Sequence, residues 1–197
     1  IVYSPQSLKS SCEPLGNMAS WCTRTANNNY FDNYRRDHPK PDGSLSDYYV
    51  VMPLELFTSQ QPSGHDFYPL QFHFESDQIR DKTQSGHSNI DDEEVDKVLN
   101  DFPGMAEFFR NELGDLAAQS IRSGIGLMEN HYIKYLKMFG GTVTSHVPEE
   151  AYAEGIESIK RLAKEDDGPI KNNRYVKWLK ENTDEDIDIT TYISEDT

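Results

Sequence analysis

The residues best suited to chemistry lie on one short stretch of the chain, residues 67–76. Apolar and polar side chains alternate there, and His73 and Glu75 stand two positions apart. A strand directs alternate side chains to opposite faces, so His73 and Glu75 are predicted to share one face. Imidazole and carboxylate groups are ligands for zinc and related cations. The stretch therefore predicts part of a divalent-cation site.

Such a site needs a further ligand, and His65 and His87 lie in the predicted loops on either side. A metal bound by His73, Glu75 and His87, or by His65 in its place, would lower the pKa of a bound water. That water would be the nucleophile of a small hydrolase or lyase. The alternative is that His73 and Glu75 belong to the polar, solvent-facing side of an amphipathic strand.

Acidic residues near the end of the chain offer a second cation-binding pattern. Residues 184–195 place acids at positions 1, 3, 5 and 12 of an EF-hand loop, but Ile189 occupies position 6, where the loop needs Gly. The pattern therefore predicts loose binding of a divalent cation or, by default, a solvated tail. The residues expected to meet a basic partner are Asp184, Glu185, Asp186 and Asp188.

Other motifs of catalysis and cofactor binding are missing from the sequence. It contains no G-x-S-x-G, H-E-x-x-H, P-loop or G-x-G-x-x-G pattern. Gly124 and Gly126 are too few for a nucleotide loop, and they indicate a helix kink instead. We expect no organic cofactor, and we favour a protein that is not an enzyme.

The charge of the chain is strongly negative and unevenly spread. The 34 Asp and Glu against 19 Lys and Arg give a net charge of −15, of which residues 1–75 carry −3 and residues 76–197 carry −12. A negative field repels nucleic-acid phosphates and anionic lipids, and it attracts basic protein surfaces. The expected partner is therefore a basic protein rather than a nucleic acid.

The two cysteines indicate in which cellular compartment the protein works, because disulfides persist in oxidising compartments. Cys12 and Cys22 are close in sequence, and a disulfide between them would contribute roughly 3 kcal/mol. Two free thiols are the alternative. The chain begins at Ile1 with no signal-type segment, which we interpret as a processed, polyprotein-derived or trimmed chain. We expect a secreted or virion-associated protein, with the cytoplasm as alternative, and no membrane span.

The elements that must position these residues follow from hydrophobic periodicity. We predict an α+β fold, mostly α, in one domain over residues 1–197, with a loop-rich N-terminal part and a bundle-like C-terminal half of four or five helices. The predicted segments are an irregular arm (1–46), a strand pair (47–76, with strands at 47–57 and 67–76), a helical region (91–181) and an acidic tail (182–197).

Two features divide the helical region. Apolar residues recur every three or four positions from Met105 to Phe139, which predicts one very long helix, or two, broken near Gly124 and ended at Gly140. Pro148 then begins the helix with the clearest apolar stripe.

These observations favour a non-enzymatic interaction or assembly protein that binds a basic protein, alone or within an oligomer. The first alternative is the metal-dependent hydrolase or lyase that uses His73 and Glu75. The second is an inhibitor that mimics nucleic acid and occupies a nucleic-acid-binding protein. Binding that depends on salt would separate charge-led recognition, which includes the nucleic-acid mimic, from recognition of a neutral partner.

Overall fold

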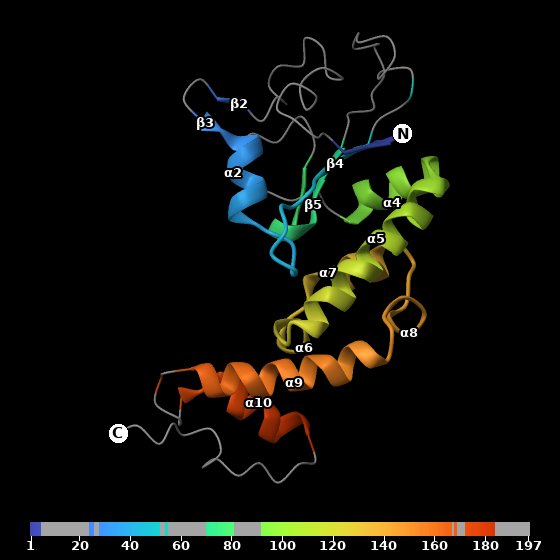
Figure 1. Cartoon of the computed structure of the whole chain (residues 1–197). Helices are drawn as coiled ribbons and strands as arrows, with labels where there is room; N and C mark the ends of the chain where they lie inside the picture. Colours follow the sequence, from blue (N-terminus) through green and yellow to red (C-terminus); the bar gives the residue numbers. More distant parts are fainter. Residues whose placement is uncertain are drawn as a thin grey trace. The chain divides into compact units, whose positions relative to one another are not determined.

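A computed structural model describes residues 1–4, 24–25, 28–51, 54, 70–80, 92–166, 168 and 172–183 (Figure 1). The contacts divide the chain into two compact units, Ile1–Phe109 and Arg110–Thr197, which are called here the first unit and the second unit. The predicted α+β fold with mostly helical content is confirmed. The single-domain organisation stays a prediction.

An antiparallel sheet of four short strands forms the centre of the first unit, in the order β1-β4-β5-β6. Its strands are β1 (Val2–Tyr3), β4 (Tyr49–Val51), β5 (Leu70–His73) and β6 (Gln78–Arg80). The strands β4 and β5 lie inside the two predicted strands and are shorter, whereas β1 and β6 were not predicted. A separate pair joins β2 (Arg24–Thr25) to β3 (Asn28–Asn29).

One face of this sheet is aromatic. Tyr49 pairs with Phe72 across β4 and β5, and the ring of Phe109 lies 5.4 Å from Tyr49, 5.0 Å from Phe72 and 5.4 Å from Phe74. Phe72, Phe74 and Phe109 are fully buried. Rings at such distances add edge-to-face attraction to the burial of apolar area. Phe109 comes from α5 (Pro103–Arg122), which follows α4 (Asp92–Asp101).

The other face of β5 is also covered, which makes the predicted solvent-facing side wrong. Gln71 is 6% exposed and His73 is 1% exposed. The cover comes from α2 (Tyr30–Asp37), whose Tyr34 ring lies 4.8 Å from the ring of His73. Residues 30–37 were predicted to be irregular as part of residues 1–46, which are rich in Ser, Asn, Pro and Gly. No apolar stripe of helical period was recognised in them.

The second unit is helical. It contains the rest of α5 and the helices α6 (Ile125–Met128), α7 (His131–Met138), α8 (Val143–His146), α9 (Glu150–Glu165) and α10 (Arg174–Asn182). The predicted breaks are confirmed: Gly124 has φ 86° and Gly140 has φ 75°, the left-handed region that favours glycine. With α4, the described part has seven α-helices from α4 to α10, because the short α6 and α8 follow these breaks.

Small residues allow close packing around α9. Its buried positions recur every fourth residue, at Ala151, Gly155, Ile159 and Ala163. A Cβ on Gly155 would collide with the carbonyl oxygen of Ile121, so α5 and α9 approach each other nearly backbone to backbone. Helices α9 and α10 lie side by side (Figure 1), and their shared core is Ile159, Ala163, Val176 and Leu179.

Candidate functional site

The predicted residues His73 and Glu75 both lie in the first unit, but on different elements. Strand β5 ends at His73, and residues Phe74–Ser76 form a short 3-10 turn. The alternation of side chains between the two faces of the strand therefore ends at His73, and Glu75 does not continue the strand. The residues are close in the fold, yet the shared strand face that suggested a joint ligand set is absent from the described structure.

His73 is an interior residue enclosed by aromatic rings. Its ring stacks on Tyr48 at 4.9 Å, with 17° between the ring planes, and meets Tyr34 edge-on at 4.8 Å. Its Nε2 atom lies 2.9 Å from Oε1 of Gln71, within hydrogen-bond distance. This environment fixes the imidazole inside the fold.

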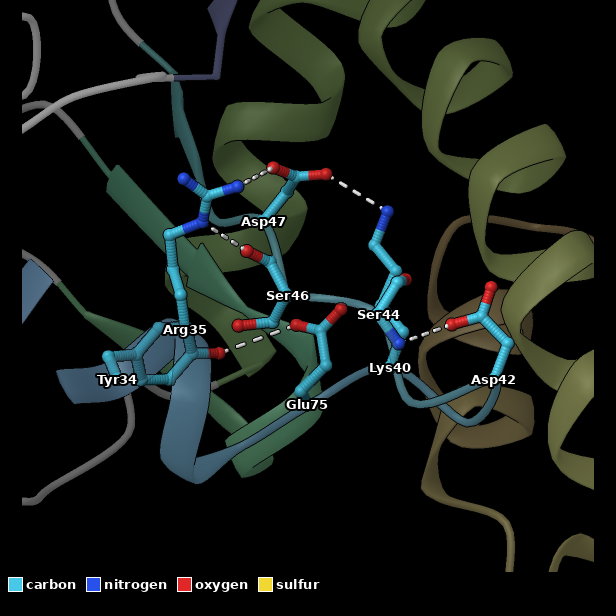
Figure 2. A network of polar contacts seen from close by, with 8 residues as sticks. All are labelled: Tyr34, Arg35, Lys40, Asp42, Ser44, Ser46, Asp47 and Glu75. Atoms are coloured by element: carbon cyan, nitrogen blue, oxygen red, sulfur yellow. Dashed lines mark hydrogen bonds and ion pairs between the residues drawn. The ribbon is translucent and has the colours of Figure 1, made fainter. Parts of the chain in front are cut away.

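Glu75 takes part in one of the polar contacts drawn in Figure 2. The Tyr34 hydroxyl donates a hydrogen bond of 3.4 Å to Oε2 of Glu75. Burial raises the pKa of Glu75 to about 7, and the nearby negative charge of Asp47 acts in the same direction. Lys40 and the Tyr34 hydroxyl favour the carboxylate and oppose this rise. Glu75 therefore changes charge near neutral pH, as a general acid or base must.

Charged groups from α2 and the following loop hold the surroundings of Glu75 together (Figure 2). Asp47 accepts contacts from both sides, with Lys40 Nζ at 2.9 Å and Arg35 Nη2 at 3.6 Å. Arg35 Nε also donates to the backbone oxygen of Ser46 at 2.7 Å. In the turn nearby, the Ser44 amide donates to Asp42 Oδ1 at 2.9 Å. The cluster ties α2 to residues 40–47, and the Tyr34 bond extends the tie to Glu75.

A metal site is not assembled within the described residues. They contain no group of three or more His, Cys, Asp or Glu side chains placed to hold an ion. His65 and His87 lie outside the described residues, as do Cys12, Cys22 and the four predicted partner-binding acids, 184–186 and 188. The metal site, the disulfide and the role of the tail stay predictions.

The negative charge is concentrated in shorter segments than the division of the chain at residue 75 indicated. Residues 110–183 carry eleven acidic and eleven basic side chains, so this stretch is neutral. The excess negative charge lies in residues 76–109, at −6, and in residues 184–197, at −6. Within the first of these, Glu93, Asp96 and Asp101 of α4 are exposed to solvent. The predicted anionic helical half is therefore confined to α4 and the tail.

A cavity lies at the C-terminal end of α4, and the sequence analysis did not predict it. Its volume is about 440 Å³, within the range of ligand pockets. It is lined by Ile1, Val2, Val51, Asp101, Phe102, Pro103, Gly104 and Met105. The pairing of β1 with β4 and the turn between α4 and α5 bring these described residues together, and the pairing has no local signal in the sequence. Among the described residues, no helix is apolar and long enough to span a bilayer.

Comparison with known proteins finds no family model, no curated protein and no solved structure that matches this chain. The function must therefore be argued from the geometry and charge of the residues themselves.

Proposed function

We propose that this chain is a non-enzymatic binding protein that recognises a basic protein surface through α4 and the acidic tail. The predicted tail contacts are Asp184, Glu185, Asp186 and Asp188. The observation that carries the proposal is the state of the α4 carboxylates. Glu93, Asp96 and Asp101 are exposed, and none of them forms an ion pair with another described residue.

Three carboxylates of the second unit differ in this respect. Glu154 pairs with Arg122 at 3.2 Å, and Glu157 pairs with Lys160 at 3.1 Å. Glu181 lies 4.0 Å from Lys177. The bases of residues 110–183 balance the acids of that stretch, whereas no described cation pairs with the exposed carboxylates of α4. An uncompensated field speeds and orients association with a surface of opposite charge.

The same proposal extends to compartment and assembly. A chain that works by charge on its surface fits a secreted or virion-associated subunit of an oligomer or larger assembly, and the cytoplasm is the alternative compartment. Duplex DNA is a useful competitor here. If the basic partner also binds DNA and each displaces the other, the chain acts as an inhibitor that mimics nucleic acid.

Charge-neutralising variants test the proposal. The α4 variant carries Glu93→Gln, Asp96→Asn and Asp101→Asn, and the control carries Asp115→Asn, Glu149→Gln and Glu150→Gln, three exposed acids of the second unit. Both lose the same net charge. Binding of a short oligolysine is measured over a series of salt concentrations.

We expect the α4 variant to bind roughly tenfold more weakly than the control, since three exposed charge contacts at about 0.5 kcal/mol each amount to one decade of affinity. The variant with the four tail acids neutralised should also bind more weakly. Equal affinity of the α4 variant and the control would show that only net charge matters, and it would remove the proposal.

A metal-assisted or acid–base enzyme is the second candidate, and the pKa of about 7 of Glu75 beside buried His73 favours it. Elemental analysis of the purified protein tests it. Stoichiometric zinc that is lost in His73→Gln would support this candidate. Protein that contains no bound metal, and that gains none in excess zinc, would remove the metal-dependent form.

A further inference from the structure

The cavity at the end of α4 combines an apolar lining with one carboxylate. Val51 and Met105, which are 2% and 5% exposed, contribute buried apolar side chains, and Phe102 adds an aromatic ring. Val2 of β1 pairs with Val51 of β4, so the sheet itself supports one wall. A hollow of this size is much larger than a water molecule needs, and its apolar lining binds water poorly.

The rim of the cavity has the opposite chemistry. Asp101 is the last residue of α4, it lines the cavity, and it is exposed without an ion pair to any described residue. Asp96 and Glu93 add negative charge along the same helix, against the single base Lys97. A ligand that enters therefore gains from an apolar group inside and from a positive charge at the entrance.

From this arrangement we infer that the cavity is the anchor site for a basic segment of the partner. One large apolar side chain of that segment enters the cavity, and a neighbouring Lys or Arg pairs with Asp101. This inference rests on the proposed function and specifies its partner: the bound segment is basic and carries an apolar anchor, rather than being uniformly basic. Interfaces concentrate their binding energy in such buried anchors, surrounded by polar contacts.

Gly104 offers a way to block the cavity without damaging the fold. It lines the cavity in the first turn of α5, and a Cβ built on it meets no atom within 4 Å. Leucine also has a higher helix propensity than glycine. The variant Gly104→Leu should therefore fold and occupy part of the cavity. Asn111→Leu, at an exposed position of the same helix, is the matched control.

The test compares two oligolysine peptides that differ only at a central residue, phenylalanine or alanine. The phenylalanine peptide should bind the unmodified chain about tenfold more tightly, because burial of one aromatic side chain is worth roughly 1.5 kcal/mol or more. This advantage should vanish in Gly104→Leu and persist in Asn111→Leu. If Gly104→Leu keeps the full advantage, the inference is wrong.

A second variant makes the test independent of the leucine substitution. Asp101→Lys reverses the charge at the rim, at an exposed position that tolerates the change. The phenylalanine peptide with lysines should then bind less tightly, and a phenylalanine peptide with glutamates should bind more tightly. The same order of affinities as in the unmodified chain would overturn the inference.

The failures of the two claims can be told apart. If both lysine peptides bind with salt dependence but with equal affinity, the cavity is no anchor and the proposed function stands. If neither lysine peptide binds in a salt-dependent way, both claims fall.

Discussion

The two units differ in the closest contacts of their interiors. In the first unit large rings pack around the sheet, with Phe109 against Tyr49 and Phe72 on one face, and Tyr34 against His73 on the other. The second unit buries rings as well, but the approach of α9 to the backbone of α5 depends on the missing side chain of Gly155. We therefore expect the stability of the first unit to depend on pH, and the stability of the second unit to fall when a side chain is enlarged.

The units also differ in how they treat charge. The first contains the half-buried carboxyl group of Glu75, which accepts a hydrogen bond from Tyr34 of α2, and it has exposed α4 carboxylates that pair with no other described residue. The stretch of residues 110–183 is neutral and has local ion pairs. Under the proposed function, this helical stretch serves as a scaffold, and the residues that bind the partner lie in the first unit and in the tail.

The largest expected effect is steric and belongs to the second unit. In Gly155→Ala the new Cβ would collide with the carbonyl oxygen of Ile121 and press on Leu127 Cδ1, 2.9 Å away. We expect the free energy of unfolding of the second unit to fall by about 3 kcal/mol, the upper range for overpacking. Hydrogen exchange of the α9 amides as a function of denaturant measures it.

Gly104→Ala is the control for this variant, because it adds the same methyl group to a helix where nothing lies within 4 Å. Alanine has a higher helix propensity than glycine, by roughly 1 kcal/mol in a helix interior, so neither substitution should destabilise through propensity. A loss of stability in Gly155→Ala alone is therefore steric. If both variants were equally stable, the close approach of α5 and α9 would be refuted.

The next effect is the pH response of the first unit. Since burial raises the pKa of Glu75 from 4.5 to about 7, the native state holds this proton more tightly than the unfolded chain does. The stabilising effect is complete below about pH 4.5 and is lost as the pH rises through 7. We expect a loss of about 2 kcal/mol over this window, after allowance for partial exposure of the group.

Glu75→Gln isolates this contribution, because other titrating groups cancel when the two chains are compared at each pH. The amides of α2 should lose protection from hydrogen exchange between pH 5 and 8 in the unmodified chain and much less in the variant, after correction for intrinsic exchange. A carboxyl resonance of Glu75 that titrates near 4.5 would contradict the account.

The smallest effect concerns the start of α10. Oδ1 of Asn173 accepts hydrogen bonds from the amides of Tyr175 and Val176, both at 3.1 Å, and its Nδ2 donates to the carbonyl of Ala163 at 2.8 Å. Asn173→Ala should lower the free energy of unfolding by about 1 kcal/mol, the usual cost of a lost N-cap. Asn173→Asp should restore the cap but not the bond to Ala163. Its free energy of unfolding should therefore lie between those of the unmodified chain and Asn173→Ala.

The sequence predicted what depends on local pattern. The apolar stripe of α9 and the glycine breaks at Gly124 and Gly140 follow from neighbours within one or two turns. The helix 30–37 was missed because it lies in a segment rich in Ser, Asn, Pro and Gly, where no apolar stripe of helical period was recognised. Its absence from the prediction also made His73 look solvent-facing.

The candidate site was less predictable for a related reason. Glu75 and His73 were singled out from the alternation of the strand, but Tyr34, Lys40 and Asp47 reach Glu75 only through the fold. The cavity needs β1 beside β4 and the turn between α4 and α5, which are separated by long stretches of chain. Contacts of this kind leave no periodic trace in a sequence.

The most direct measurement of the central claim is a map of where a cation binds. The full chain, labelled with ¹⁵N, is titrated with short oligolysine while the backbone amide shifts are followed. The account predicts that the shifts concentrate on residues 92–105 and on the tail acids at 184–186 and 188, with the amides of α9 nearly unchanged. Shifts concentrated on α9, or spread evenly over all acidic residues, would contradict it.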